Sequence, residues 1–127
     1  MNYLGLDVGT TTVTAIVVNS ESGEVVSKAT APNDAETTTP DGKAGGRSEW
    51  DPARMLDVAR MVLRDAAGPA GNVAAIGVTG QMHGMMLVNE ASDPIGPFIG
   101  WQDQRATDAD PTSDGTVIGN LTSSVES

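Results

Sequence analysis

The sequence at positions 7–12 is Asp7-Val8-Gly9-Thr10-Thr11-Thr12, and it joins two strand-like segments. Residues 3–8 alternate between apolar and other side chains, a period of two that predicts a strand. The residues from 13 to 18 form a largely β-branched run, which predicts a second, buried strand. Because glycine suits the tight turn between them, we expect a hairpin with positions 9–12 at its tip.

The tip of this hairpin carries groups that suit an anion and its metal ion. The Asp7 carboxylate is a hard oxygen ligand suited to Mg²⁺ or to magnesium-bound water. Glycine lets the backbone approach an anion closely, and threonine amides and hydroxyls can donate to phosphate oxygens. An ordinary hairpin with glycine at its turn is the alternative interpretation. The candidate residues for a phosphate ligand are Asp7, Gly9, Thr10, Thr11 and Thr12, with Asp7 a metal ligand through water.

The next segments extend this hairpin into a small sheet. Turn residues at 19–23 lead to an extended run at 24–31, so we expect three strands in an antiparallel meander. Residues 32–48 are polar, include two prolines and lack a regular apolar period, which predicts a surface loop outside the core.

A helix is expected directly after this loop. Asp51 suits its N-cap and Pro52 its first position. The apolar positions predicted to face the core are Met55, Leu56, Ala59, Val62, Leu63 and Ala66. Gly68 and Pro69 are expected to end the helix.

Further extended segments follow the helix. We expect a buried strand at 73–79, another strand at 84–89, a turn at 91–96 and a short extended segment at 97–101. Beyond Arg105 no periodic pattern predicts an element. Three strands, a helix and a strand in this order predict an α/β layer.

Composition narrows the possible partners. Seven basic residues oppose seventeen acidic ones, so the net charge is -10. Such a surface repels nucleic-acid backbones and anionic lipid, and it would also repel ATP unless backbone N–H groups and Mg²⁺ offset its field. The absence of cysteine excludes disulfides and thiolate metal sites. We expect a cytoplasmic protein, because the N-terminus shows no signal peptide and the chain no membrane span.

A second motif, Gly80-Gln81-Met82-His83-Gly84, follows the predicted strand at 73–79. Ligands of α/β folds bind at strand ends, where the flanking glycines would let these side chains project. Gln81 and His83 could bond to hydroxyl groups, and Met82 could supply an apolar wall. The alternative is a structural histidine in the core. A metal site is not expected at this motif, because the sequence has no second histidine and no carboxylate at ligand spacing from His83.

A third motif, Trp101-Gln102-Asp103-Gln104-Arg105, combines an aromatic face with a carboxylate and a guanidinium. A tryptophan face packs against the apolar side of a sugar ring, and the charged groups can bind its hydroxyls. The alternative is a core tryptophan beside a local ion pair between Asp103 and Arg105. Taken alone, this motif favours that alternative.

Together with Glu49-Trp50-Asp51-Pro52, the three motifs stand in the order and rough spacing of the FGGY carbohydrate kinases, which the chain resembles over residues 3–105. The second motif is similar to the xylulokinase and sedoheptulokinase branches, and Trp-Gln-Asp is closer to sedoheptulokinase. The resemblance implies a ribonuclease H-like α/β domain of the actin, Hsp70 and sugar-kinase superfamily, here its incomplete N-terminal portion. An Hsp70-like ATPase is disfavoured, because that family gives no reason for the second and third motifs.

The resemblance also implies a function: phosphoryl transfer from Mg·ATP to a primary hydroxyl of a ketose or polyol. By that likeness the residues at the sugar are Gln81, Met82, His83, Trp101, Asp103 and Arg105. The general base, an aspartate, and a second phosphate loop are expected downstream of this chain. We therefore expect the 127-residue chain alone to be inactive, with 1–105 as the family's first domain and 106–127 as its weakly structured continuation. A non-catalytic nucleotide- or sugar-binding module is the alternative.

Overall fold

A computed structural model describes residues 1–117 and contains a four-stranded sheet. Its strands are β1 (Asn2–Val8), β2 (Thr12–Asn19), β3 (Val25–Pro32) and β5 (Val73–Gly80), in the order β3-β2-β1-β5. The first three pair antiparallel, which confirms the predicted meander, and β5 pairs parallel to β1.

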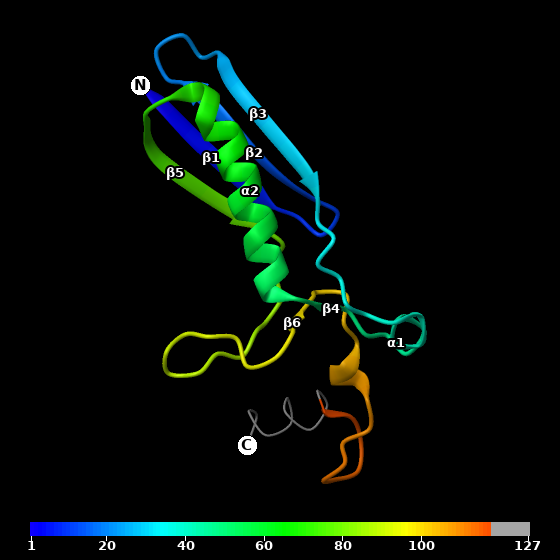
Figure 1. Cartoon of the computed structure of the whole chain (residues 1–127). Coiled ribbons are helices and arrows are strands. Elements are labelled where there is room, and N and C mark those ends of the chain that lie inside the picture. Colours follow the sequence, from blue (N-terminus) through cyan, green and yellow to red (C-terminus); the bar gives the residue numbers. More distant parts are fainter. Residues whose placement is uncertain (118–127) are drawn as a thin grey trace.

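One long helix, α2 (Pro52–Ala70), covers one face of this sheet, packing across β3, β2 and β1 (Figure 1). The core between helix and sheet is aliphatic, as the few aromatic residues in the sequence require. Its buried members are Leu4, Leu6, Val13, Ala15, Val17, Ala31, Val58, Ala59, Val62 and Ala66. Alternate residues of β1 and β2 therefore point away from α2, toward the open face of the sheet.

The start of α2 is as predicted, but its end is not. The Asp51 side chain accepts a hydrogen bond from Ala53 N–H and caps the helix. The helix continues through Pro69, because a proline in the last turn has a helical φ and removes only one N–H. It ends before Gly71, whose φ is 70°. The predicted core face was also wrong in part, since Leu56 is 49% exposed and Val58 is buried.

The strand predicted at 73–79 is confirmed as β5, but its predicted burial was wrong. Ile76 is 56% exposed and Val78 is 70% exposed. The cause is position, because β5 is the edge strand next to β1 while α2 lies over the other three strands. The apolar run therefore predicted the strand, but it did not predict whether a helix packs against that strand.

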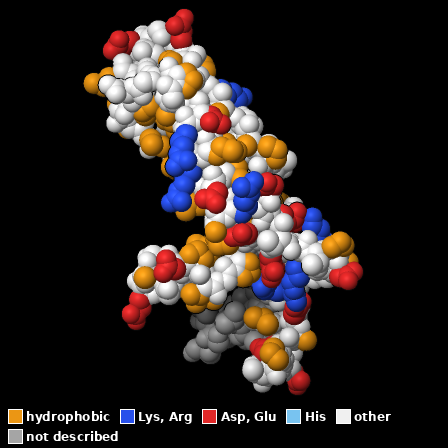
Figure 2. Space-filling view, viewed as in Figure 1, with side chains coloured by type: hydrophobic (Ala, Val, Ile, Leu, Met, Phe, Trp, Pro, Cys, Tyr) orange, Lys and Arg blue, Asp and Glu red, His pale blue; other side chains and the backbone are white. Residues whose placement is uncertain are grey.

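A smaller, two-stranded sheet lies beyond the N-terminal end of α2, formed by β4 (Glu49–Trp50) and β6 (Phe98–Ile99) (Figure 1). The strand predicted at 84–89 was wrong: that segment makes only isolated bridges, Met85 to Ile99 and Val88 to Pro94. This loop between β5 and β6 carries exposed apolar side chains, visible in Figure 2, from Met85, Met86, Leu87, Val88 and Ile95.

The segment 32–48 is more ordered than a simple surface loop. It contains a short helix, α1 (Pro40–Ala44), whose N-cap Thr39 accepts a hydrogen bond from Gly42 N–H. Asn33, Ala35 and Ser48 are buried within it. The prediction that this segment contributes nothing to the interior was therefore wrong, because small and polar side chains can be buried where hydrogen bonds satisfy them.

The described chain ends in a short 3-10 helix, η1 (Arg105–Thr107), followed by an isolated bridge between Ala109 and Thr116. The predicted boundary at residue 105 stays a prediction, and residues 118–127 of that last segment lie outside the described residues. Over the described range 1–117, no helix has the length and apolar character to span a membrane.

Candidate functional site

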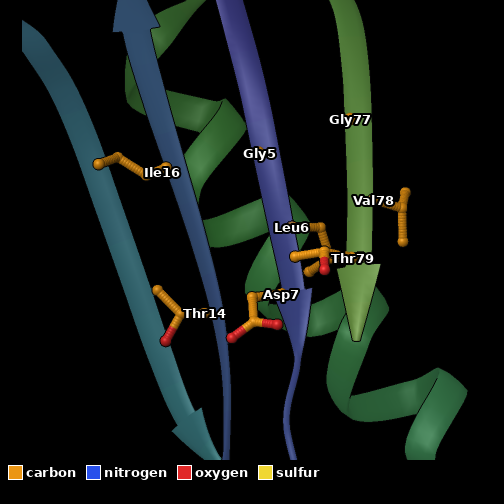
Figure 3. Close-up of a pocket in the computed structure, with 8 residues that line it drawn as sticks. All are labelled: Gly5, Leu6, Asp7, Thr14, Ile16, Gly77, Val78 and Thr79. Carbon is orange, nitrogen blue, oxygen red and sulfur yellow. The ribbon is translucent and has the colours of Figure 1, made fainter. Parts of the chain in front are cut away.

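Asp7 lies near the end of β1 on the sheet face that α2 does not cover. Its cross-strand partners are Thr14 on β2 and Thr79 on β5. Figure 3 shows these three side chains around a hollow of about 400 Å³, which Gly5 and Gly77 also line. Within residues 1–117 the Asp7 carboxylate accepts no hydrogen bond and forms no ion pair, so its oxygens are available to a ligand.

The loop that follows Asp7 is tightly closed. Gly9 N–H donates to the carbonyl oxygen of Thr12 at 2.9 Å. A Cβ atom at Gly9 would lie 2.9 Å from that same oxygen, so only glycine fits without a shift. The hairpin tip at 9–12 thus has the compact backbone that the sequence predicted.

Asn33 braces this loop from the side of β3, a role that the sequence analysis missed. Its carboxamide donates to Gly9 O at 2.8 Å, and its backbone N–H donates to Thr11 O at 2.9 Å. Asn33 is only 7% exposed. An asparagine just after a proline in a polar segment is typical of a turn, so no signal in the sequence distinguished it.

The second motif begins at the same edge of the sheet as the first. Gln81 N–H donates to Val8 O at 3.0 Å, directly between the ends of the parallel strands β1 and β5. A Cβ at Gly80 would lie 3.0 Å from the same carbonyl oxygen, so glycine permits the close approach. The hairpin at 9–12 and the Gln-Met-His loop are therefore joined by one backbone hydrogen bond.

The side chains of this loop face different environments. Met82 is 73% exposed, and His83 is also exposed, with a positive φ of 61°. The alternative interpretation, a structural histidine in the core, is thus wrong, and the sugar-binding role stays a prediction. The Gln81 carboxamide is buried in a hollow lined by Val8, Met55 and Phe98, and neither its nitrogen nor its oxygen has a hydrogen-bond partner among residues 1–117.

The loop is held at its far end by β6. A Cβ at Gly84 would lie 2.1 Å from the Phe98 ring, so the ring packs directly on the glycine backbone. Met85 and Ile99 exchange two backbone hydrogen bonds at 3.0 and 2.8 Å. The exposed residues Met82 and His83 are therefore supported on both sides, by β1 and by β6.

The third motif divides between an exposed tryptophan and a partly buried ionic network. Trp101 is 55% exposed, so it is not the core tryptophan of the alternative interpretation. The Asp103 side chain is only 2% exposed and pairs with Arg105, as that interpretation expected. Asp103 also accepts from Ser48 N–H at 2.8 Å, and Arg105 reaches Glu49 at 2.6 Å.

Protonation of this network follows from its contacts. The side-chain hydrogen bonds from Arg105 are the main cause that holds the pKa of Asp103 well below its usual value, against the opposing effect of burial, and the Ser48 N–H adds to them. The same pairing raises the pKa of Arg105, with a further contribution from Glu49. Both groups are charged, and both carboxylate oxygens of Asp103 accept hydrogen bonds, so in this arrangement the pair fixes the backbone around Trp101 and β4.

The site residues suit a metal ion that keeps its waters and is bound together with a nucleotide. They do not suit a metal ion held by protein side chains alone. No cluster of three or more His, Asp or Glu side chains able to hold a metal occurs among residues 1–117. Asp7 is a single free carboxylate beside a glycine-containing loop, which suits an ion that keeps most of its waters and bridges to phosphates, as Mg²⁺ does.

Comparison with known proteins agrees with these features. Residues 2–111 match the N-terminal domain of the FGGY family of carbohydrate kinases. The xylulose kinase of Streptomyces rubiginosus is 31% identical over 103 residues, 81% of this chain and 20% of that protein. The xylulose kinase of Klebsiella pneumoniae is 35% identical over 109 residues, 84% of this chain and 21% of that protein.

A solved structure gives the same result for the fold. The crystal structure of xylulose kinase from Rhodospirillum rubrum superposes with a TM-score of 0.73 at 32% identity, over 85% of this chain and 22% of that one. The chain thus spans about one fifth of the length of these relatives. The family resemblance and the ribonuclease H-like α/β fold class predicted from the motifs are confirmed.

Proposed function

Because the chain belongs to the FGGY family of carbohydrate kinases, we propose that it forms one wall of a site for phosphoryl transfer from Mg·ATP to a sugar hydroxyl. The observation that carries this proposal is the hydrogen bond from Gln81 N–H to Val8 O, which fixes the first two motifs at one edge of the sheet. Phosphoryl transfer depends on positioning two substrates against each other, and such a fixed distance serves that purpose.

The hairpin supplies the nucleotide side of the proposed site. Asp7 would orient Mg²⁺ through its waters, and Gly9 would admit a phosphate close to the backbone. The amides and hydroxyls of Thr10, Thr11 and Thr12 would donate to phosphate oxygens. These residues would hold Mg·ATP, whose phosphoryl group would be transferred and whose Mg²⁺ would offset the negative charge of the phosphates.

The loop at 81–83 and Trp101 supply the sugar side. Met82 and His83 are exposed beside the hairpin, so they are proposed to contact the sugar directly, with the Trp101 face against its ring. Gln81, Asp103 and Arg105 belong to the same proposed site. The Gln81 amide and the Asp103 carboxylate are buried and Arg105 is partly exposed, so these residues are proposed to support the sugar side from below. No general base is assigned among these residues.

The proposed acceptor is a ketose of the xylulose or sedoheptulose type. The names of the relatives support xylulose, whereas Trp-Gln-Asp at 101–103 is closer to sedoheptulokinases. The net charge of -10 argues against a nucleic-acid or anionic-membrane partner. A cytoplasmic location is part of the proposal, because Mg·ATP is available there.

The test is a coupled ADP-release assay of the full-length gene product with xylulose, sedoheptulose and glycerol. We expect turnover that requires Mg·ATP and is faster with a ketose than with glycerol. Calorimetric binding of Mg·ATP or of a sugar without turnover on any acceptor would instead establish the non-catalytic binding module.

A further inference from the structure

Asn33 is a buried polar residue whose contacts are concentrated on the hairpin loop. It follows directly after β3, and its neighbour Ala35 is 2% exposed. Two of its donors bind two carbonyl oxygens of the loop, those of Gly9 and Thr11. Because Asn33 is itself 7% exposed, it acts on a ligand only through the loop that it holds.

These two bonds determine where the loop N–H groups point. A trans peptide carries its C=O and its N–H on opposite edges. The Gly9 carbonyl shares its peptide with the N–H of Thr10, and the Thr11 carbonyl shares its peptide with the N–H of Thr12. Asn33 holds the Gly9 carbonyl with its side chain and the Thr11 carbonyl with its backbone N–H, so the N–H groups of Thr10 and Thr12 point away from Asn33.

We propose that Asn33 is a positioning residue for phosphate binding, one that aims the amides of Thr10 and Thr12 at the nucleotide. The inference rests on the proposed function for the identity of the anion. Preorganised backbone donors bind an anion more tightly than donors that must first be ordered, because the cost of ordering is not paid again on binding. Removal of the Asn33 side chain should therefore weaken the binding of Mg·ATP more than it weakens the binding of the sugar.

The alternative is that Asn33 only stabilises the end of β3, and Asn2 provides a matched control for it. The Asn2 carboxamide also donates to a backbone carbonyl, Ala70 O, at 2.9 Å and is partly buried. It lies at the opposite end of β1 from the hairpin. Replacing either asparagine by the near-isosteric leucine removes one carboxamide bond to a carbonyl without adding charge. It also removes one bond that the carboxamide oxygen accepts, from Ala35 N–H at Asn33 and from Asn19 Nδ2 at Asn2, so the two losses are matched.

The experiment compares Asn33→Leu with Asn2→Leu in the full-length gene product. Calorimetry measures the Kd for Mg·ATP, and the coupled assay measures KM for the sugar. For Asn33→Leu we expect a roughly 5- to 50-fold weaker Kd for Mg·ATP and a sugar KM within about twofold of the parent. For Asn2→Leu we expect both constants to stay within about twofold, with a comparable loss of thermal stability.

Hydrogen exchange keeps this inference separable from the proposed function. The Gly9 amide, bonded to Thr12 O, should exchange at least about tenfold faster in Asn33→Leu than in Asn2→Leu. If the parent protein neither binds Mg·ATP nor turns over, the kinase proposal fails, and the exchange of Gly9 alone decides whether Asn33 holds the loop.

Three results would overturn the inference: unchanged exchange at Gly9, unchanged affinity for Mg·ATP, or equal weakening by both leucine variants. Should Asn33→Leu fail to fold, Asn33→Ala removes the same bond with no added bulk, and the same criteria apply to it against Asn2→Ala.

Discussion

The backbone N–H of Gln81 donates to the carbonyl oxygen of Val8 across the ends of two neighbouring parallel strands. Val8 immediately follows Asp7, and Gln81 immediately precedes Met82, so this one bond joins the proposed nucleotide side to the proposed sugar side. A shift of either strand end would move both groups, because packed β-strands transmit displacement rather than absorb it.

The first prediction concerns Asp7. Asp7→Asn preserves size but removes the charge proposed to orient Mg²⁺ and its waters, and one preorganised electrostatic contact is worth roughly 10²–10³-fold in kcat. We expect that loss with little change in sugar KM, measured by steady-state kinetics. Asp57→Asn, an exposed change on α2, serves as the control and should leave kcat unaltered. A near-normal kcat in Asp7→Asn would contradict the phosphate-site assignment and support the alternative interpretation, an ordinary hairpin turn.

The second prediction concerns the buried Gln81 amide, which has no hydrogen-bond partner within the described residues. Gln81→Met fills the same volume without polar atoms, so it should raise the free energy of unfolding by about 1–2 kcal/mol. Urea denaturation measures this change. Gln102→Met, at an exposed position, should have an effect near zero. A clear loss of stability in Gln81→Met would show that the amide is satisfied in solution.

The third prediction concerns the acid stability of the Asp103 network. A carboxyl whose folded pKa is depressed stabilises the protein above its unfolded pKa of about 4, and this contribution is lost as pH falls toward the folded pKa. Asp103→Asn should therefore lower the free energy of unfolding at pH 7 by about 2–3 kcal/mol and flatten its decline below pH 4.

Urea melts at pH 7, 4 and 2.5 test this, with Asp34→Asn as the control. Asp34 also forms a bidentate ion pair, with Arg54, but this pair lies at the exposed surface. The pKa of Asp34 is likewise lowered, mainly by the hydrogen bonds from Arg54. Solvent screens such a pair, so its loss should matter much less. Equal effects of the two substitutions would contradict the structural role assigned to Asp103.

How far the sequence predicts this structure depends on whether the information is local. The meander, the N-cap at Asp51 and the strand at 73–79 follow from period and turn chemistry within a few residues, and all were predicted correctly. The exposure of Val78 was not predictable in this way, because it depends on which strands α2 happens to cover.

The candidate site shows the same division. The motif residues were found from local spacing and family resemblance, and the structure brings the first two motifs to one sheet edge. The partners of Asp103 were only half predictable: Arg105 lies two residues away, whereas Ser48 and Glu49 lie more than fifty residues earlier. Asn33 was missed for the same reason, since its role depends on contacts with a loop 24 residues away.

The last prediction separates recognition from stability at His83. This residue is exposed with a φ of 61°, a conformation strained for any side chain that carries a Cβ. His83→Ala retains the Cβ and hence the strain, so thermal stability should barely change while the imidazole is lost. If the imidazole bonds to a sugar hydroxyl, sugar KM should rise roughly 5- to 150-fold, with KM for ATP little altered.

Ser92→Ala is the matched control for His83→Ala, because Ser92 also has a positive φ, of 66°, in the segment between β5 and β6. That substitution should leave both KM values and the Tm unchanged. Measuring Tm and sugar KM on one preparation of each variant isolates the imidazole from the backbone strain. A sugar KM in His83→Ala that matches the Ser92→Ala value would remove His83 from the substrate site and leave Met82 and Trp101 as its proposed contacts.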